Sequence, residues 1–252
     1  MKKLLLLAFL LTGLLQAAEP TSCTPVPQSY DANYWWMIRH RAKLQEIQER
    51  GDIIDVAFIG DSITHNYEST GASVWKKHFE GNPYNAINLG YGGDQTQNLL
   101  YRLADGELDG YSAKAIVLMI GTNNSTRDST YPWETALGVK AILARIRERQ
   151  PQAKIILTAI FPRGRGVDDK GHAEARARND RTNEILKTFA DGEKVVWLDI
   201  SDRLADPETK WTTPAMFPDR IHPSDAAYRI WLSALAEAVD RAFAAEVPIS
   251  AR

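Results

Sequence analysis

Five short apolar segments recur along the chain, and the stretches between them have the pattern of helices. The apolar segments are residues 53–59, 85–89, 115–120, 154–160 and 195–200. Apolar runs of this length, rich in β-branched residues, are typical of strands buried on both faces of a parallel sheet. Helices are predicted over residues 131–149, 173–190 and 223–245. Strands that alternate with helices predict an α/β fold, in which helices cover both faces of a five-stranded parallel sheet.

One more helix is predicted before the first strand. It runs from about Ala32 to Arg50, and Gly51 ends it. His40 lies on the apolar face of this helix, together with Ile47. We therefore expect His40 to be a packed structural residue and not a catalytic one.

The amino terminus has the features of a cleavable signal peptide over residues 1–18. Two lysines precede an uncharged apolar stretch of 12 residues, which is too short to span a bilayer, and Ala17-Ala18 follows it. Residues 19–30 carry three prolines and are predicted to be a linker, and residues 31–247 a single domain. These features predict an exported bacterial protein, periplasmic or secreted, with no stable membrane insertion after cleavage.

Cys23 is the single cysteine, so no internal disulfide is expected. A lipid on Cys23 is the alternative to a plain thiol in an N-terminal arm. A lipidated cysteine usually follows a leucine-like residue by three places, and that place holds Pro20. The residue pattern therefore favours the thiol.

Charge and composition exclude several classes of function. The formal net charge of the 252-residue chain is −2, and loss of Lys2 and Lys3 would make it −4. The chain has no basic block of the kind that binds nucleic acid. It also has no His-Glu-x-x-His motif and no pair of cysteines, so we expect neither a metal nor another cofactor.

A candidate nucleophile follows the first strand directly. The segment Gly60-Asp61-Ser62-Ile63-Thr64 places Ser62 at the carboxyl edge of the sheet, where open α/β sheets bind their ligands. A simpler interpretation is that Ser62 only caps the helix that follows. Further chemistry near this edge would favour the nucleophile.

A base and an acid for such a serine lie far along the chain. Asp219 precedes His222 by three residues, and in a compact turn the carboxylate can reach one ring nitrogen while the other faces Ser62. If Pro223 begins the last helix, His222 is its N-cap. An isolated Asp-x-x-His could also be no more than a surface turn.

Donors for a negatively charged oxygen follow the next two strands. Gly90, Gly92 and Gly93 can bring backbone N–H groups close to a substrate, and Asn123 offers a side-chain amide. The long irregular stretches 121–130 and 201–222 each follow a predicted strand, as does 161–172. All three should therefore gather beside Ser62.

Taken together, these segments resemble the GDSL or SGNH hydrolases. The signature serine, glycine, asparagine and histidine of that superfamily match Ser62, Gly93, Asn123 and His222, and Asp219 completes a triad. Ile63 stands where the family usually has leucine. Over roughly residues 35–235 the chain is more closely similar to the catalytic subunits of intracellular platelet-activating-factor acetylhydrolase Ib, and to related exported bacterial acetylesterases.

This resemblance implies a flavodoxin-like three-layer α/β/α fold and a metal-free serine esterase that forms an acyl-enzyme. The oxyanion donors would be the N–H groups of Ser62 and Gly93 and the side chain of Asn123. In the acetylhydrolase the small acyl pocket is walled by three residues that correspond here to Ile63, Thr122 and Ile221. The expected substrates are therefore short acetyl O-esters, small or polymeric.

The alcohol part of the substrate is a separate question. Exported relatives suggest acetylated carbohydrates, and Trp211 and Phe217 in the loop 201–218 could stack on a sugar. The alternatives are a platelet-activating-factor-type acetylhydrolase or lysophospholipase acting on lipids, and a non-catalytic glycan-binding or assembly protein. Arg163 could contact a charged substrate, although a solvated arginine at the rim is the simpler expectation. A homodimer is a candidate assembly.

Two other enzyme folds do not fit the motifs. The α/β-hydrolase fold requires Gly-x-Ser-x-Gly, and Thr64 stands where its second glycine should be. A Rossmann dinucleotide site would need its glycine fingerprint after the first strand, which Gly60-Asp61-Ser62 does not supply.

Overall fold

Five parallel strands form one sheet in the spatial order β2-β1-β3-β4-β5. The strands are β1 Val56–Gly60, β2 Ala86–Gly90, β3 Ala115–Met119, β4 Lys154–Thr158 and β5 Val195–Leu198. All five predicted strands are thus confirmed. The chain runs outward from β1 in both directions, and Gly60 pairs with Gly90 on one side and with Met119 on the other. The carboxyl end of β1 is therefore a topological switch point, where sheets of this kind bind ligands.

The computed structural model describes residues 20–28, 34–81, 83–126 and 130–244. The predicted signal peptide and the predicted domain end at residue 247 lie outside the described residues. No helix within the described residues is long and apolar enough to cross a membrane.

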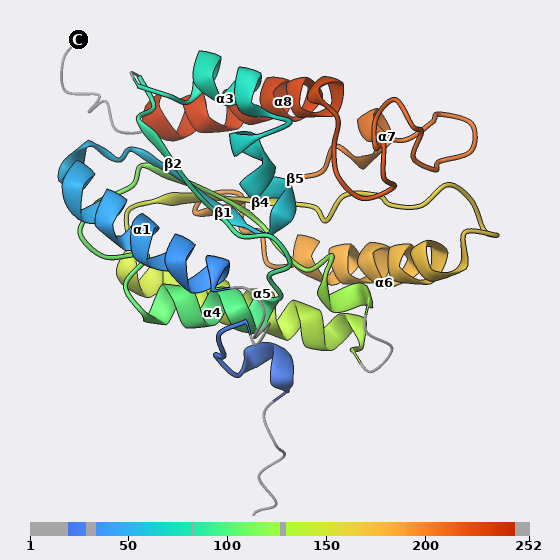
Figure 1. Cartoon of the computed structure of the whole chain (residues 1–252), viewed down its shortest axis with the longest axis horizontal. Helices are drawn as coiled ribbons and strands as arrows, with labels where there is room; N and C mark the ends of the chain where they lie inside the picture. Colours follow the sequence, from blue (N-terminus) through green and yellow to red (C-terminus); the bar gives the residue numbers. More distant parts are fainter. Residues whose placement is uncertain (1–19, 29–33, 82, 127–129, 245–252) are drawn as a thin grey trace, which may run out of the picture.

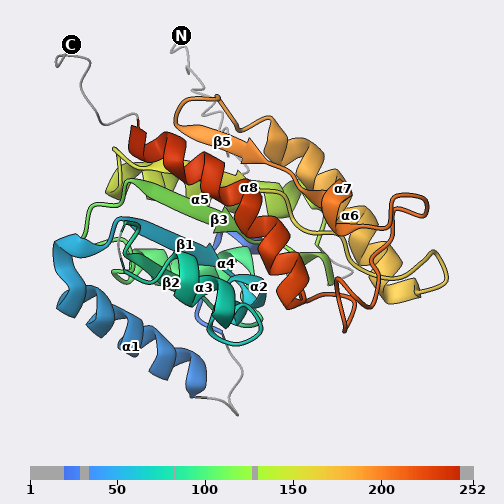
Figure 2. The same cartoon turned by 90° about the horizontal axis from the view of Figure 1, so that it is seen from above.

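Helices cover both faces of the sheet, as Figures 1 and 2 show, so the predicted three-layer arrangement is confirmed. One layer contains α1 Trp35–Arg50, α4 Thr96–Ala104, α5 Pro132–Arg149 and α6 Lys170–Lys187. The other contains α3 Ala72–His78, α7 Ser201–Leu204 and α8 Asp225–Ala244. The short α2 Ser62–His65 begins beyond the end of β1. The remaining single turns are η1 Thr21–Cys23, η2 Gly51–Ile53, η3 Asn66–Glu68 and η4 Asn124–Thr126.

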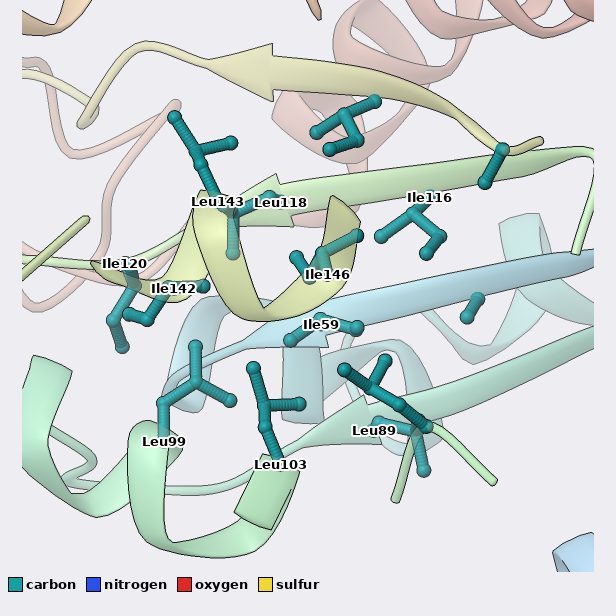
Figure 3. Packing of buried hydrophobic residues seen from close by; sticks show 14 of the residues in the cluster. Ile59, Leu89, Leu99, Leu103, Ile116, Leu118, Ile120, Ile142, Leu143 and Ile146 are labelled. Atoms are coloured by element: carbon teal, nitrogen blue, oxygen red, sulfur yellow. The ribbon is translucent and has the colours of Figure 1, made fainter. Parts of the chain in front are cut away.

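Successive residues of each strand point to opposite faces of the sheet and so belong to two separate hydrophobic cores. Ile59, Leu89 and Leu118 pack against α4 and α5 (Figure 3). Their neighbours Phe58 and Val117 point to the opposite face and pack against α3 and α8. Because both faces of the sheet are covered, the strands need no polar side, which explains their largely apolar sequences.

The last helix begins later than predicted. Helix α8 starts at Asp225, not at Pro223. Ser224 lies before it, and the Ser224 hydroxyl and carbonyl oxygens accept the N–H groups of Ala227 and Tyr228 at 3.3 and 2.9 Å. The prediction that His222 is the N-cap is therefore wrong, and serine takes that role, as its short hydroxyl side chain favours.

Residues 20–28, predicted as part of a linker, are docked on the domain. Ser22 is buried, and its hydroxyl donates to the Glu134 carbonyl at 2.6 Å. Thr96 Oγ1 donates to the Ser22 carbonyl at 2.9 Å, and Asn98 Nδ2 to the Val26 carbonyl at 3.1 Å. Prolines remove backbone donors, but carbonyl groups and side chains can still dock such a segment.

A buried arginine of α4 connects the ends of two strands. Arg102 forms ion pairs with Asp94 and Glu107, and all three side chains are buried. Its terminal nitrogens also donate to the carbonyls of Leu89 and Gly60, each at 3.3 Å. One guanidinium thus joins the carboxyl ends of β1 and β2 to the loop that follows β2.

Replacing Arg102 by methionine should destabilise the fold strongly. The change keeps much of the side-chain volume but leaves two buried carboxylates without their cation, which typically costs about 3–5 kcal/mol. Urea unfolding followed by circular dichroism measures this loss. Arg229→Ala, which breaks an exposed pair with Asp225, is the control and should hardly move the midpoint. A loss below about 1 kcal/mol for Arg102→Met would contradict the proposed importance of the pair.

Candidate active site

Ser62, His222 and Asp219 form one hydrogen-bonded chain. Ser62 Oγ lies 2.8 Å from His222 Nε2, and His222 Nδ1 lies 2.6 Å from Asp219 Oδ2. Since the carboxylate accepts the Nδ1–H, Nε2 of the neutral ring is left to accept the serine proton. The structure therefore brings together three predicted residues that are up to 160 positions apart.

The turn that carries Asp219 and His222 is fixed by its own backbone. Asp219 Oδ1 accepts the N–H groups of Ile221 at 3.0 Å and His222 at 2.7 Å. Partial burial alone would raise the pKa of Asp219, but these bonds and the His222 ring outweigh it and lower the pKa to about 2. Asp219 is therefore ionised throughout the pH range in which the protein would work.

The loops that follow β3, β4 and β5 meet at this edge, as predicted. The Gly164 N–H donates to the Arg220 carbonyl at 3.1 Å, and Thr212 Oγ1 donates to the Gly164 carbonyl at 2.6 Å. Arg165 donates to the Phe217 carbonyl at 2.9 Å. The loop after β4 thus holds both ends of the segment that leads to His222.

Three groups that follow the carboxyl ends of β1, β2 and β3 each have an N–H free to donate. The N–H groups of Ser62 and Gly93 have no hydrogen-bond partner within the described part of the chain. Asn123 Nδ2 donates one N–H to the Asp94 carbonyl at 2.9 Å, which leaves its second N–H for a ligand. The three positions predicted to be oxyanion donors are therefore all capable of donating.

The glycine turn after β2 is held from several sides. His65 Nδ1 accepts the Gly92 N–H at 3.2 Å, and the His65 ring stacks on Trp35 with centroids 5.9 Å apart. Burial, reinforced by the charge of Arg39, lowers the pKa of His65 to about 4. The ring is therefore neutral near pH 7 and can act as the acceptor that this turn requires.

Asp61 lies beneath the serine and is fully buried. Its Oδ1 accepts the Ile63 N–H at 3.0 Å and caps α2, whereas Oδ2 has no partner within the described residues. Burial, aided by the nearby charge of Asp94, raises the pKa of Asp61 to about 7. This carboxyl is therefore neutral below pH 7, so it adds little negative charge beside the donor groups.

The predicted walls of the acyl pocket are fixed in position. Ile63 and Thr122 are buried, and Ile221 is half-buried. The Tyr228 hydroxyl donates to the Ile63 carbonyl at 2.6 Å, and Asn179 Nδ2 lies 3.4 Å from Thr122 Oγ1. These contacts limit how far either wall can move.

The structure corrects two expectations about the rim. Arg163 is only 4% exposed and donates to the Thr122 carbonyl at 3.3 Å, so it is not a solvated rim residue. Phe217 is completely buried and packs in the core beside α8. The guanidinium of Arg176 lies over the Trp211 ring, 5.0 Å from the ring centroid. Of the two aromatic residues expected to stack on a sugar, Phe217 is therefore not accessible, and Arg176 covers part of the Trp211 ring.

Sequence reasoning did not assign a role to four residues that support the site. They are Gln28, His65, Asp94 and Arg102. One signal was available: Arg102 lies between Leu99, Leu100 and Leu103 on an otherwise apolar helix face, and a charge in that position needs a buried partner. The roles of Gln28 and His65 depend on contacts that no local pattern encodes. No group of three or more His, Cys, Asp or Glu residues in the described part of the chain could hold a metal ion.

Comparisons with known proteins agree with this geometry. A model of the GDSL-like Lipase/Acylhydrolase family matches residues 58–230. Platelet-activating factor acetylhydrolase IB subunit alpha2 from Homo sapiens is 36% identical over 170 residues, which cover 68% of each chain.

Solved structures show the same fold. A GDSL-like lipase from Bacteroides thetaiotaomicron matches with a TM-score of 0.68 at 18% identity, over 81% of this chain and 98% of that one. Axe2, an acetylxylan esterase from Geobacillus stearothermophilus, matches with a TM-score of 0.56 at 19% identity, over 75% of this chain and 95% of that one.

His65 should make stability depend on pH in mild acid. Its pKa is near 6.5 when unfolded and about 4 when folded, so the unfolded chain takes up the proton first as the pH falls. The His65 contribution is therefore complete above pH 6.5 and is lost as the pH falls toward 4. His65→Asn keeps an acceptor for Gly92 but does not titrate. Urea midpoints between pH 4 and 7 should fall less steeply for this variant than for the wild type, and parallel curves would refute the assignment.

Proposed function

The chain belongs to the GDSL-like lipase/acylhydrolase family and is a carboxylic ester hydrolase; we propose that it removes acetyl groups from O-acetylated carbohydrates through an acyl-enzyme on Ser62. The observation that carries the serine mechanism is the hydrogen-bonded chain from Ser62 Oγ through His222 to Asp219. The unused donors of Ser62, Gly93 and Asn123 lie on the same edge of the sheet. A glycan-binding or assembly protein without activity would have no use for this combination.

In the first half-reaction Ser62 Oγ attacks the ester carbonyl carbon while His222 Nε2 takes the hydroxyl proton. The carbonyl oxygen becomes negative and is held by the Ser62 and Gly93 N–H groups and the Asn123 amide. As the C–O bond to the alcohol breaks, His222 returns the proton to the leaving oxygen. The products are the free alcohol and acetyl-Ser62, and Asp219 stays ionised throughout.

In the second half-reaction water replaces the alcohol. His222 Nε2 takes a proton from the water as its oxygen attacks the acetyl carbonyl, and the same donors hold the oxyanion. The bond to Ser62 Oγ then breaks, the proton on His222 returns to the serine, and acetic acid leaves and gives its remaining proton to the solvent. Each turnover consumes one water and restores the resting hydrogen bond between Ser62 and His222.

Acetyl specificity is supported by the walls around the serine. The buried positions of Ile63 and Thr122, and the bonds that fix them, leave little freedom for a longer acyl chain. Both residues are β-branched, so few other rotamers are available to which their side chains could move to make room for a longer acyl chain.

An exposed pair of aromatic rings supports a carbohydrate as the alcohol part of the substrate. Tyr131 and Trp133 are 61% and 51% exposed, and their planes are only 12° apart with centroids separated by 6.3 Å. They lie where α5 begins, just after the loop that carries Asn123. Large exposed aromatic side chains usually mark a binding surface. The structural likeness to an acetylxylan esterase is in line with a sugar ligand.

A lipid ester is the second candidate, because the human relative is named as an acetylhydrolase of platelet-activating factor. A screen of purified protein against acetylated xylan, acetylated monosaccharides, sialic acid acetates and short acetyl phospholipids tests the proposal. Ser62→Ala is the blank for each substrate. The proposal fails if only the phospholipids are hydrolysed, or if Ser62→Ala is as active as the wild type. Export by the signal peptide, a periplasmic or secreted location and a homodimer remain predictions from the sequence.

Asn123→Ala should lower kcat by about 10²–10³-fold, the usual effect of removing one oxyanion donor. The KM for a small acetyl ester should change much less, since the donor acts mainly on the transition state. Steady-state kinetics with nitrophenyl acetate measure both constants. A variant with normal kcat and a raised KM would show that Asn123 binds substrate instead.

Activity should fall steeply with acyl length. A butyryl group would have to displace packed atoms of Ile63 or Thr122, at a typical cost of 1–3 kcal/mol, which is about 5- to 150-fold in rate. The measurement is kcat/KM for nitrophenyl acetate, butyrate and octanoate, corrected for spontaneous hydrolysis. Replacing Ile63 and Ile221 by alanine should move the optimum to longer chains. Equal rates on acetate and octanoate in the wild type would contradict this assignment.

Trp133→Ala should weaken hydrolysis of a polymer more than that of a small ester. Loss of one stacking ring should raise the KM for acetylated xylan by about 2- to 13-fold, since an aromatic contact is worth roughly 0.5–1.5 kcal/mol. Trp133 makes none of the hydrogen bonds that hold the triad or the oxyanion donors, so the kinetics on nitrophenyl acetate should stay the same. Leu137→Ala, one turn further along α5, is the matched control. Equal effects of Trp133→Ala on both substrates would argue against a sugar site there.

A further inference from the structure

Gln28 reaches from the N-terminal segment to the turn that carries Gly93. Its single amide nitrogen donates one hydrogen to the Gly92 carbonyl at 2.9 Å and the other to Asp94 Oδ1 at 2.7 Å. A Cβ placed on Gly93 would lie only 3.5 Å from the same nitrogen. The side chain therefore bridges the residue before Gly93 and the residue after it.

The first of these bonds acts on the peptide group that would bind the oxyanion. The Gly92 carbonyl and the Gly93 N–H belong to one planar trans peptide, so they point in opposite directions. A donor fixed on the carbonyl therefore fixes the direction of the N–H. Because glycine lies on both sides of this peptide, and Gly93 has a φ of +79°, steric restraints alone would not prevent it from rotating.

The same bond also makes the N–H a stronger donor. A hydrogen bond to the oxygen of an amide polarises the group, and neighbouring bonds in such a chain strengthen each other by about 10–30%. The Gly93 N–H would thus meet the oxyanion already polarised by Gln28, which needs no rearrangement during the reaction.

The second bond, from Gln28 to Asp94, also bears on the position of Asn123, which is another of the expected oxyanion donors. Asp94 Oδ1 also accepts the Trp36 indole N–H at 2.7 Å, and Oδ2 accepts from Arg102 at 2.8 Å. The Asp94 carbonyl in turn holds Asn123 Nδ2 at 2.9 Å. Gln28, through Asp94, therefore fixes Gly93 and Asn123 relative to one another.

Gln28 is itself held in place by the docked segment. Val26 is bonded through its N–H to the Gln97 carbonyl at 3.2 Å and through its carbonyl to Asn98. This segment lies outside residues 58–230, the part of the chain that the family model matches. The catalytic unit would then begin well before the matched region.

We infer that Gln28 is a positioning residue that orients and polarises the Gly93 N–H of the oxyanion hole. The inference rests on the esterase function proposed above. Gln28 does not touch the reacting atoms, and it acts only through the Gly92–Gly93 peptide and Asp94. Its removal should therefore change kcat and leave substrate binding nearly unaltered.

Gln28→Met tests this in the full-length protein, since methionine has a similar length and no donor. We expect kcat for nitrophenyl acetate to fall about 5- to 20-fold, less than for loss of a whole donor, with KM within twofold. Val26→Ala, two residues away with an exposed side chain, is the matched control and should behave as the wild type. A kcat for Gln28→Met within twofold of that of Val26→Ala, or a change confined to KM, would overturn the inference.

Gln28→Glu provides a readout that a merely structural role would not move. The ionised carboxylate cannot donate and faces Asp94, which should raise the pKa of the introduced carboxyl. Its protonated form has one O–H donor in nearly the same place. The ratio of its kcat to that of the wild type should therefore rise as the pH falls from about 8 to about 5, and a ratio independent of pH would count against the inference.

The two proposals can fail separately. If the wild type hydrolyses no acetyl ester beyond the Ser62→Ala blank, the esterase function is wrong and the role of Gln28 falls with it. If the wild type is active, Ser62→Ala is inactive and both Gln28 variants match Val26→Ala, only the role of Gln28 is wrong. Thermal midpoints are measured for every variant, so that each kcat is referred to folded protein.

Discussion

The ion pairs of Arg102 are the interaction on which the rest of the site depends. A buried guanidinium is costly to desolvate, and this one is balanced by Asp94 and Glu107 on either side. Burial would raise the pKa of Glu107, but Arg102 and the other donors around it lower that pKa instead. His40 extends the cluster, with one ring nitrogen 3.1 Å from Glu107 and the other 2.8 Å from Asp105. The charges therefore form a connected network with little choice of arrangement.

This network lies directly under the catalytic edge, so its rigidity is passed on to the reacting groups. Arg102 holds the Gly60 carbonyl, one residue before Asp61 and two before Ser62. Through Asp94 it also holds the loop that presents Gly93 and the side chain of Asn123. A serine nucleophile and an oxyanion hole must be aligned within fractions of an ångström. One buried cation that contacts both strand ends is a direct way to keep that alignment.

The sequence predicted those features that are encoded by residues close together in the chain. It did not predict features that depend on contacts between distant residues. Strands β1 to β4 are buried on both faces and β5 is half-buried, so their apolar runs are easily recognised. His40 was correctly predicted to be structural. Helices α3 and α4 were missed, because α3 has only two turns and α4 follows the glycine turn without a break. The start of α8 was misplaced because Pro223 suits a first helical turn, yet Ser224 is the better cap. Residues 20–28 were predicted as a linker because docking through carbonyls and side chains leaves no periodic trace.

The same distinction separates chemistry from substrate choice. The candidate catalytic groups follow strand ends, and their spacing along the chain is set by the sheet, so a motif can identify them. The rim is built by loops and by the first turn of α5. Pro132 and the capping bond from the Tyr131 N–H to Glu134 fix that turn. This is why the rings of Tyr131 and Trp133 lie next to each other. Phe217, which looked equally available in the sequence, is buried against α8. An aromatic residue in a loop therefore indicates a ligand site only once the structure shows which of its faces is left uncovered.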